Sequence, residues 1–294
     1  MAEICFLGTG GSVATPERDN TSFIINFHGG ARRKVPDSNV SRQKLILIDC
    51  PGSIIQKVKK LGFSPLEIGT ILVTHIHPDH IYGLPSLVHS LMLEEGLIRL
   101  YGSEETIKFC RRFLDLFGLQ EKRFKMRIGY VPITPGQTFS LESHAEVTAL
   151  SVPHHSSSLA YHFRFCRNAL KSLSPTVHPS AESPDSDAAG TLDLVYSGDT
   201  PVDTVLIDAA HSADCLIHDC SAPSRIFEEY PILYNMHTHS LALGRLAHKA
   251  GVRSLIPCHF FGEVAFSLTE LEEEIRRSFN GKLIIPHDFD KIQL

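Results

Sequence analysis

The chain has 294 residues, of which 43% are hydrophobic and 21% are charged, and these values exclude a disordered, collagen-like or coiled-coil protein. Its 28 Lys and Arg residues against 33 Asp and Glu residues give a formal net charge of −5, which disfavours general binding to nucleic acid or anionic membranes. The unusual feature is the count of 17 histidines, because histidine is a common metal ligand and titrates near neutral pH.

The predicted elements begin with strands and then alternate between strands and helices. Short apolar or β-branched runs bounded by Gly, Asn or Pro predict strands, and apolar residues at helical spacing predict helices. In chain order we expect strands at 4–7, 22–27 and 45–49, a helix at 53–61, a strand at 70–73, helices at 84–97 and 104–117, and strands at 129–132, 146–152 and 160–165. The remaining elements are a strand at 192–196, a helix at 202–210, a strand at 215–218, a helix at 241–250, a strand at 254–257, a helix at 268–279 and a strand at 283–286.

Two polar segments interrupt this alternation. Residues 31–44 contain five basic side chains and are predicted to form a hairpin tip or loop rather than a basic contact surface. Residues 167–191 include a stretch rich in Ser, Pro, Asp and Ala, which predicts a mobile loop. Because the sequence shows no internal repeat and no linker, residues 1–294 are predicted to form one domain.

Neither the N-terminus nor the cysteines predict a secreted protein. The first residues carry no basic segment ahead of an apolar run, so no secretory signal is expected. No apolar run approaches the ~20 residues that a membrane helix requires. The seven cysteines form no CxxC pair, a pattern typical of reduced and buried residues. We therefore expect a cytoplasmic protein with no membrane partner.

The densest group of candidate metal ligands directly follows a predicted strand. Residues 74–80 read Thr-His-Ile-His-Pro-Asp-His, which places three histidines and an aspartate within six residues. Because side chains of an extended chain repeat every second residue, His75 and His77 can point the same way. Asp79 and His80 then turn toward a neighbouring point. This arrangement fits two adjacent cations better than one, and a polar loop with incidental histidines is the weaker interpretation.

Candidate ligands of the same types follow three later predicted strands: His154 with His155, then Asp199, and then His259. Functional side chains gather on such loops in layered folds. Alone, each would be a turn former or a structural histidine, but together with residues 74–80 they predict one metal site. Imidazole and carboxylate suit Zn²⁺ or Mn²⁺, and the absence of cysteine ligands argues against a purely structural zinc site.

The segment His75-Ile76-His77-Pro78-Asp79-His80 resembles the HxHxDH motif of the metallo-β-lactamase superfamily. Further segments resemble the ribonuclease Z-like branch of that superfamily. These are Phe6-Leu7-Gly8-Thr9-Gly10, Asn20-Thr21-Ser22, Leu47-Ile48-Asp49-Cys50, Tyr82-Gly83-Leu84-Pro85, His154 with Ser158-Leu159-Ala160-Tyr161, and His237-Thr238. The resemblance covers nearly the whole chain and implies an α+β fold of four layers, the αββα sandwich, with metals at one edge.

The resemblance also implies a set of metal ligands and the chemistry that goes with them. It assigns His75, His77 and His154 to one ion, Asp79, His80 and His259 to a second, and Asp199 to both. The cofactors would be two divalent ions, with Zn²⁺ favoured and Mn²⁺ or Fe²⁺ as alternatives. A hydroxide shared between the two ions would be the nucleophile.

Other residues of the same segments become candidate catalytic or substrate-binding groups. Asp79 and His237 are the candidate catalytic residues, and His237, Tyr161 and Ser158 are the candidate substrate-binding residues. His237 is not needed as a ligand, so we expect it to contact a phosphate or assist the leaving group; the alternative is a supporting or surface histidine. Asp219 stands where the branch often has a glutamate, and it could orient His237 with a shorter side chain. Three more histidines, His155, His218 and His239, are near the site in sequence and could support the ligands.

The function implied by the resemblance is a metal-dependent hydrolase, most simply a phosphodiesterase. Members that process precursor transfer RNA carry a long basic arm, whereas residues 167–191 hold two basic and three acidic side chains here. Phosphate contacts from cations dominate RNA affinity, so we expect a small or cyclic phosphodiester as substrate. The alternatives are a ribonuclease Z that processes transfer RNA 3′ ends, or a hydrolase of the same fold acting on a lactone, thioester or lactam. A sulfur-oxidising iron enzyme and a non-catalytic accessory protein are further alternatives, and a homodimer is a candidate assembly.

Overall fold

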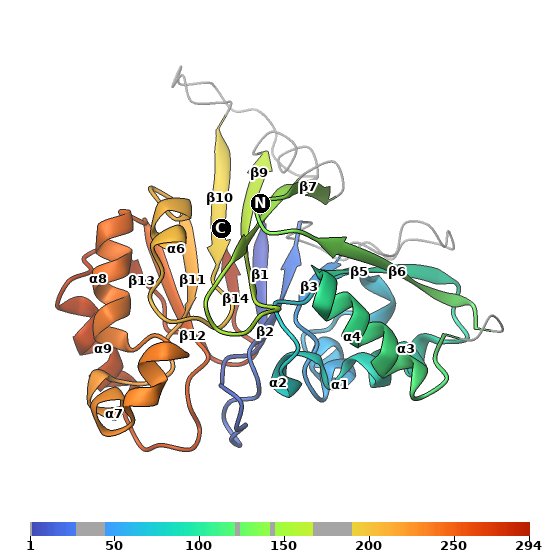
Figure 1. Cartoon of the computed structure of the whole chain (residues 1–294), viewed down its shortest axis with the longest axis horizontal. Helices are drawn as coiled ribbons and strands as arrows, with labels where there is room; N and C mark the ends of the chain where they lie inside the picture. The colour runs from blue at the N-terminus through green and yellow to red at the C-terminus, as the bar shows by residue number, and fades with distance from the viewer. Residues whose placement is uncertain (1, 28–44, 121–123, 142–144, 167–189) are drawn as a thin grey trace.

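The computed structural model describes residues 2–27, 45–120, 124–141, 145–166 and 190–294. Within these residues, two seven-stranded sheets pack face to face and helices cover both outer faces (Figure 1). These are the four layers of the predicted αββα sandwich. The two predicted polar segments lie outside the described residues: all of 31–44, and 167–189 of the segment 167–191.

The first sheet has the strand order β14-β1-β2-β3-β4-β5-β6 and is parallel from β3 to β6. Its strands are β1 (Glu3–Gly8), β2 (Ser22–Asn26), β3 (Leu45–Ile48), β4 (Ile68–Leu72), β5 (Gly96–Ser103), β6 (Met126–Ile133) and β14 (Lys291–Gln293). The helices on this side are α1 (Ile54–Lys60), η2 (Pro65–Glu67), α2 (Pro78–Ile81), α3 (Leu84–Leu91) and α4 (Glu104–Asp115). The apolar faces of α1, α3 and α4 pack against the outer face of this sheet.

The second sheet has the strand order β13-β12-β11-β10-β9-β8-β7 and is parallel from β10 to β13. Its strands are β7 (Thr138–Leu141), β8 (Ala145–Ser151), β9 (Leu159–Cys166), β10 (Thr191–Tyr196), β11 (Cys215–Asp219), β12 (Ser254–Cys258) and β13 (Lys282–Leu283). The helices on this side are α6 (Thr204–Ala209), α7 (Ser224–Glu229), η3 (Pro231–Asn235), α8 (Ser240–Ala250) and α9 (Leu268–Arg276). Of these, α6, α8 and α9 pack on the outer face of the sheet.

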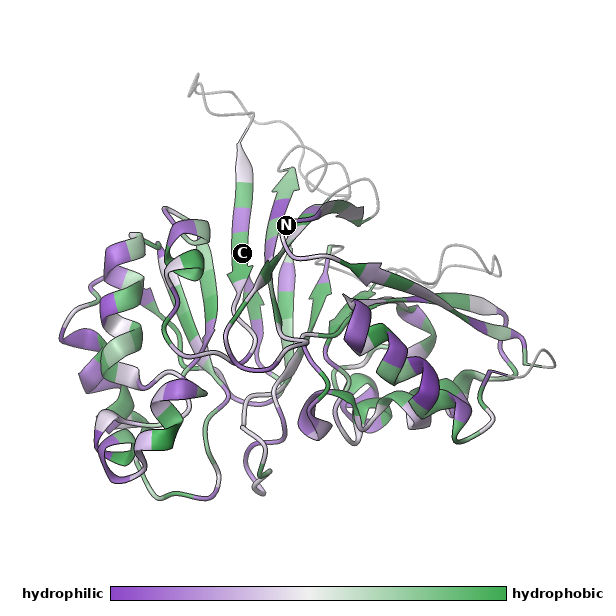
Figure 2. Cartoon of the chain, in the orientation of Figure 1, coloured by the Kyte–Doolittle hydropathy of each residue, from purple (hydrophilic) through white to green (hydrophobic). Residues whose placement is uncertain are grey.

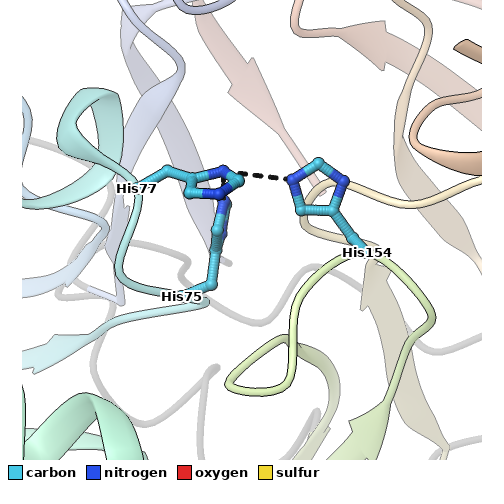
Figure 3. A group of neighbouring side chains, drawn as sticks. All are labelled: His75, His77 and His154. Carbon is cyan, nitrogen blue, oxygen red and sulfur yellow. Dashed lines mark hydrogen bonds between the residues drawn. The ribbon is translucent and has the colours of Figure 1, made fainter. Parts of the chain in front are cut away.

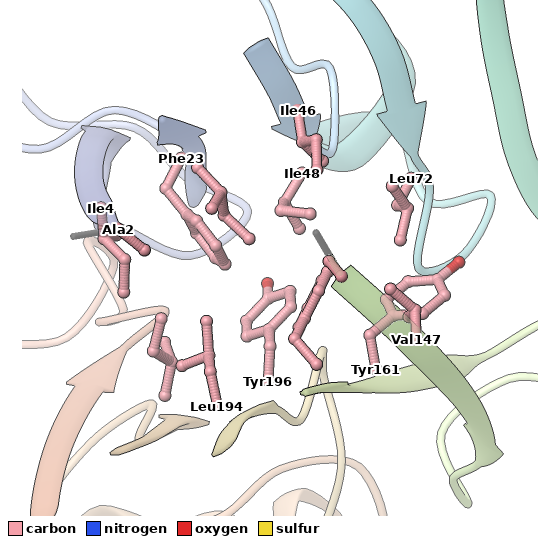
Figure 4. Packing of buried hydrophobic residues seen from close by; sticks show 14 of the residues in the cluster. Ala2, Ile4, Phe23, Ile46, Ile48, Leu72, Val147, Tyr161, Leu194 and Tyr196 are labelled. Atoms are coloured by element: carbon pink, nitrogen blue, oxygen red, sulfur yellow. The ribbon is translucent and has the colours of Figure 1, made fainter. Parts of the chain in front are cut away.

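The strands carry near-continuous apolar runs because both of their faces are covered. In β1, Ile4 and Phe6 point between the sheets, whereas Cys5 and Leu7 point toward the helices. Figure 2 shows the resulting concentration of hydrophobic residues in the central strands. Figure 4 shows the layer between the sheets, where Tyr161 faces across to the strands of the first sheet. Burial on both sides therefore fixes the two sheets as one rigid support for the loops at their edge.

Several predicted elements differ from the observed ones. The predicted helix at 84–97 ends at Leu91, and Gly96 begins β5, which the sequence did not predict. The strands β7 and β14 and the helix α7 were also missed. Short apolar runs do not distinguish a strand from the end of a helix by periodicity, and this ambiguity explains the error at β5. None of the described helices has both the length and the apolar character needed to cross a membrane.

Candidate metal centre

The predicted ligands lie at one edge of the sandwich, where strands of both sheets end. His75 and His77 follow β4 of the first sheet. From the second sheet, His154 follows β8, Asp199 follows β10, and His259 follows β12. His259 adopts a left-handed backbone with φ of 65°, a conformation that costs a non-glycine residue free energy and is typical of functional sites. Loops far apart in the sequence therefore bring their imidazole and carboxylate groups to one place.

Three histidines form the first group of candidate ligands (Figure 3). His75 Nε2 lies 2.9 Å from His77 Nδ1, and His77 Nδ1 lies 3.2 Å from His154 Nε2. Figure 3 shows the rings of His77 and His154 approaching from different loops. Their nitrogen atoms all lie within 4.8 Å of one another, which is the spacing expected of ligands around one ion.

The second group consists of Asp79, His80, Asp199 and His259. Asp199 Oδ2 is 3.3 Å from His80 Nε2 and 3.1 Å from His259 Nε2. The same oxygen is 3.8 Å from His75 Nε2 and 3.9 Å from His154 Nε2. The carboxylate of Asp199 therefore faces both groups, as the predicted bridging ligand would.

In His154 and His80, the ring nitrogen that faces away from the site is held by another group. His154 Nδ1 donates a hydrogen bond of 2.7 Å to the carbonyl of Met236. His80 Nδ1 lies 2.8 Å from Oδ2 of Asp49, whose carboxylate also accepts from the backbone N–H of Thr74. Such contacts fix ring orientation and leave Nε2 free for a metal ion. The sequence prediction named Asp49 only as part of a family segment and missed this role, although a buried aspartate at the end of an apolar strand was a signal for it.

The electrostatics of the two groups differ. Burial and the nearby His80 hold the pKa of His75 well below its ordinary value, so His75 is neutral. Burial is the largest single influence on His80 and His259 and opposes their charge, but the surrounding carboxylates, with Asp199 foremost, together outweigh it and raise both pKa values well above the ordinary range. The two histidines in turn hold the pKa of Asp199 well below its usual value in spite of its burial.

The donor set fits two divalent ions. The Nε2 atoms of His80 and His259 are buried, and neither forms a hydrogen bond among the described residues. Each lies 3.1–3.5 Å from carboxylate oxygens of Asp79 and Asp199, a spacing that suits ligands of one shared cation. Imidazole nitrogen and carboxylate oxygen are ligands of Zn²⁺ and of related transition metals. The residues present therefore suit a dinuclear site.

His237 lies beside both groups of ligands and is held by Asp219. Its Nδ1 is 2.9 Å from Asp219 Oδ2, and its ring stacks on that of His259 at 5.1 Å between centroids. The ring of His154 is 5.0 Å away on another side. Asp219 is itself fixed, because it accepts hydrogen bonds from the backbone N–H of Thr200 and the hydroxyl of Ser221. The shorter side chain of aspartate therefore reaches His237.

Two predicted substrate-binding residues do not face the site. Tyr161 is fully buried in the layer between the sheets, and its hydroxyl donates to the carbonyl of Val73 at 2.8 Å. Ser158 is also buried, and its hydroxyl accepts from the backbone N–H of His155 within the same turn. Tyr161 lies on the face of β9 that is turned inward, toward the first sheet. Ser158 shapes the turn that presents His154.

His155, His218 and His239, the histidines that could support the ligands, have different surroundings. The ring of His155 lies 5.4 Å from that of His77, and His155 Nδ1 contacts the hydroxyl of Ser157. His239 accepts from the backbone N–H of Ala242 and so caps α8. His218 is fully buried in β11, and its Nδ1 lies 2.8 Å from the carbonyl of Asp219. Of the three, only His155 lies against a candidate ligand.

Comparison with known proteins identifies the family. A model of the Beta-lactamase superfamily domain matches residues 44–260. Ribonuclease Z of Methanosarcina acetivorans is 26% identical over 322 residues, which span 100% of this chain and 98% of that protein. Ribonuclease Z of Pyrococcus furiosus is 26% identical over 99% of this chain and 96% of its own length.

Solved structures share the fold. The short form of human tRNase Z has a TM-score of 0.68 and 17% identity, covering 99% of this chain and 98% of its own. A metallo-β-lactamase fold protein from Bacillus subtilis has a TM-score of 0.70 and 16% identity over 100% of both chains. The chain belongs to the metallo-β-lactamase superfamily and is a metal-dependent hydrolase of its ribonuclease Z-like branch.

Proposed function

We propose that this hydrolase cleaves phosphodiester bonds and that its substrates are RNA 3′ ends. The observation that carries the proposal is the position of His237, which Asp219 holds beside both ligand groups. Cleavage of a phosphodiester expels an alkoxide, which needs a proton, whereas a thioester expels a thiolate that needs none. A histidine held beside the ligands can donate that proton.

Seven side chains would hold the two ions: His75, His77 and His154 for one, Asp79, His80 and His259 for the other, and Asp199 for both. When bound, two divalent ions supply an activated water and neutralise the charge that develops on the phosphoryl oxygens. Asp79 belongs to this set and acts through the ion that it would hold. Its predicted catalytic role is therefore that of a ligand.

The remaining steps belong to residues of this chain. Asp219 occupies Nδ1 of His237, so the ring presents Nε2 to the leaving oxygen and donates a proton there. Thr200 and Ser221 keep the carboxylate of Asp219 in place while this happens. Precise orientation of the proton donor is what makes such transfer efficient.

The choice of RNA over a small phosphodiester rests on the relatives. Those named Ribonuclease Z match nearly the full length of both chains, which favours the same class of substrate here. A small or cyclic phosphodiester is the second candidate, and one observation favours it. Residues 167–191 hold two basic and three acidic side chains, so they offer little charge for binding RNA phosphates.

Hydrolysis assays with the metal-loaded protein separate these candidates. The substrates are a precursor transfer RNA with a 3′ trailer, a 2′,3′-cyclic nucleotide and bis(p-nitrophenyl) phosphate. We expect removal of the RNA trailer to be much faster than hydrolysis of either small compound. Activity on the small compounds alone would support the second candidate. Activity only on a lactone or thioester would overturn the proposal.

Three substitutions test the proposed roles within the site. Asp199→Ala and His77→Ala are expected to abolish metal-dependent hydrolysis. His237→Ala should lower kcat by about 10²-fold or more, since this is the usual contribution of a general acid. Elemental analysis of His237→Ala should still find both ions, and a lost ion would show instead that His237 is a ligand.

A further inference from the structure

An exposed apolar segment adjoins the candidate metal centre. Residues 230–236, called the rim segment below, include the short helix η3 and read Tyr-Pro-Ile-Leu-Tyr-Asn-Met. The exposed fractions are 64% for Ile232, 45% for Tyr234 and 36% for Met236. Large apolar side chains at this exposure, gathered in one short segment, are typical of a binding surface.

The rim segment is joined to the centre through its backbone. The carbonyl of Met236 accepts the hydrogen bond from His154 Nδ1, and the next residue is His237. The backbone N–H groups of Met236 and His237 both donate to the carbonyl of Leu233, which closes the segment into a compact turn. A substrate whose phosphate reaches the metal centre therefore passes within reach of the rim segment.

The ring of Tyr234 is held in place before any ligand binds. It lies 5.4 Å from the ring of Phe227 and 5.6 Å from that of His239, with interplanar angles of 71° and 88°. Phe227 is buried with Ala222 and Ile226 in a small apolar cluster under the rim segment. A fixed aromatic ring that remains nearly half exposed loses little conformational entropy when another flat ring stacks on it.

We propose that the rim segment is a stacking platform for unpaired nucleobases next to the scissile phosphate. This inference rests on the proposed function. The rim segment carries no charge, and Glu228 and Glu229 precede it, so it does not attract phosphates. Base–aromatic stacking needs no cation and is tolerant of sequence. It would supply RNA affinity that a chain without a basic arm does not obtain from charge.

A comparison of tailed RNAs tests the platform. One RNA hairpin carries an unpaired 3′ tail, and its partner carries the same tail with abasic nucleotides. For wild-type protein, removing the bases should raise KM by about tenfold or more. Tyr234→Ala should show the same rise on the normal tail and little further rise on the abasic tail. Tyr234→Phe keeps the ring and should behave as wild type.

Two more variants separate stacking from general damage. Ile232→Ser removes a side chain that is 64% exposed, so the fold should survive while KM on the normal tail rises. Phe117→Ala, at a position 61% exposed beyond the end of α4, is the matched control and should leave KM on both tails unchanged. The slope of log affinity against log salt should be the same for wild type and Tyr234→Ala, because no phosphate contact is lost.

If removal of the bases raised KM equally for wild type and for Tyr234→Ala, the inference would be overturned. A change of oligomeric state in Ile232→Ser would also overturn it, because a second copy would then be the occupant of the rim segment. Failure of the proposed function would appear separately, as no hydrolysis of any phosphodiester. In that case, fluorescence anisotropy of the two RNAs with the metal-loaded protein still decides the inference, and binding of neither RNA would overturn it.

Discussion

His80 and His154 of the candidate metal centre use their two ring nitrogens differently. One nitrogen faces the site, and the other is held by a neighbouring group, which is the carboxylate of Asp49 for His80 and the carbonyl of Met236 for His154. His237 follows the same rule through Asp219. The holding group sets which nitrogen is free, so it influences the chemistry without itself binding an ion.

Substitution of Asp219 by Asn tests this rule at His237. Asparagine keeps the size of the side chain but replaces a carboxylate oxygen with an amide, so the ring can rotate or change tautomer. We expect kcat to fall by about tenfold or more, with KM and metal content close to wild type. Steady-state kinetics and elemental analysis measure these quantities.

The double variant Asp219→Asn/His237→Ala provides the control. If the two residues act as a unit, the double variant should be no slower than His237→Ala alone. Losses that multiply in the double variant would show that Asp219 serves the reaction through some other contact, such as its hydrogen bonds with Thr200 and Ser221.

The sequence predicted the candidate ligands better than the groups that hold them. Four of the candidate ligands are within six residues of each other and the rest follow predicted strands, so local pattern pointed to them, and the family resemblance chose His154 over His155. The contacts of Asp49 and of the Met236 carbonyl join segments 31 and 82 residues apart in the sequence. An aspartate at the end of an apolar strand hints at a buried role for Asp49, but no local pattern gives the partner of either group. The inward position of Tyr161 was not predictable from the resemblance, because a matching residue in a motif does not tell which face of a strand its side chain occupies.

Between the elements, Glu274 links the starts of two helices near the site. Its carboxylate on α9 accepts from the backbone N–H of Ser224 at 2.9 Å, and from the hydroxyls of Ser224 and Ser240. Ser224 begins α7 and Ser240 begins α8, and the rim segment and His237 lie between these two helices. One buried side chain therefore fixes both ends of the segment that carries the proposed proton donor.

Glu274→Gln is expected to destabilise the protein by about 1–3 kcal/mol, because an amide replaces a charged acceptor of several buried hydrogen bonds. Glu273→Gln changes the exposed neighbour on the same helix and should cost less than about 0.5 kcal/mol. Urea denaturation of both variants at pH 7 measures the difference. Equal stability of the two variants would contradict the role of Glu274.

The pH dependence of this difference follows from the pKa of Glu274. Burial opposes its charge, but the hydrogen bonds from Ser224 and Ser240 outweigh burial and lower the pKa. A depressed pKa gives stability that is present above the unfolded value, about 4.3, and is lost as the pH falls through the folded value. The stability gap between wild type and Glu274→Gln should therefore narrow below about pH 4.

The order of the elements was predictable only where the pattern was long or strongly apolar. The predicted strands at 4–7, 22–27 and 215–218 correspond to β1, β2 and β11, since each is buried on both faces. β14 has three residues and exists because β1 offers it an edge to pair with, and no local signal marks such a strand. The four-layer arrangement itself came from the family resemblance and not from the elements.

At the scale of the whole molecule, the metal centre joins the two sheets. Each group of candidate ligands contains residues from the loops of both sheets, so each ion would bind the two halves together. An ion that binds only the folded state at 100 times its Kd stabilises that state by about 2.7 kcal/mol. For a chain of 294 residues, we expect chelation to lower Tm by about 4 °C for each ion lost.

The size of this shift should depend on pH, because protons compete with the ions. In metal-free protein, the raised pKa values of His80 and His259 contribute stability below the unfolded value of about 6.5, and that stability is lost as the pH rises through the folded values. Metal binding needs neutral imidazole and releases these protons. The increase of Tm on adding metal should therefore be larger at pH 8 than at pH 6. His80→Gln should lose the part of the increase that comes from the ion His80 would hold, about half, whereas His211→Gln, at an exposed position, should keep it all. An increase that is independent of pH and undiminished in His80→Gln would place the ions elsewhere.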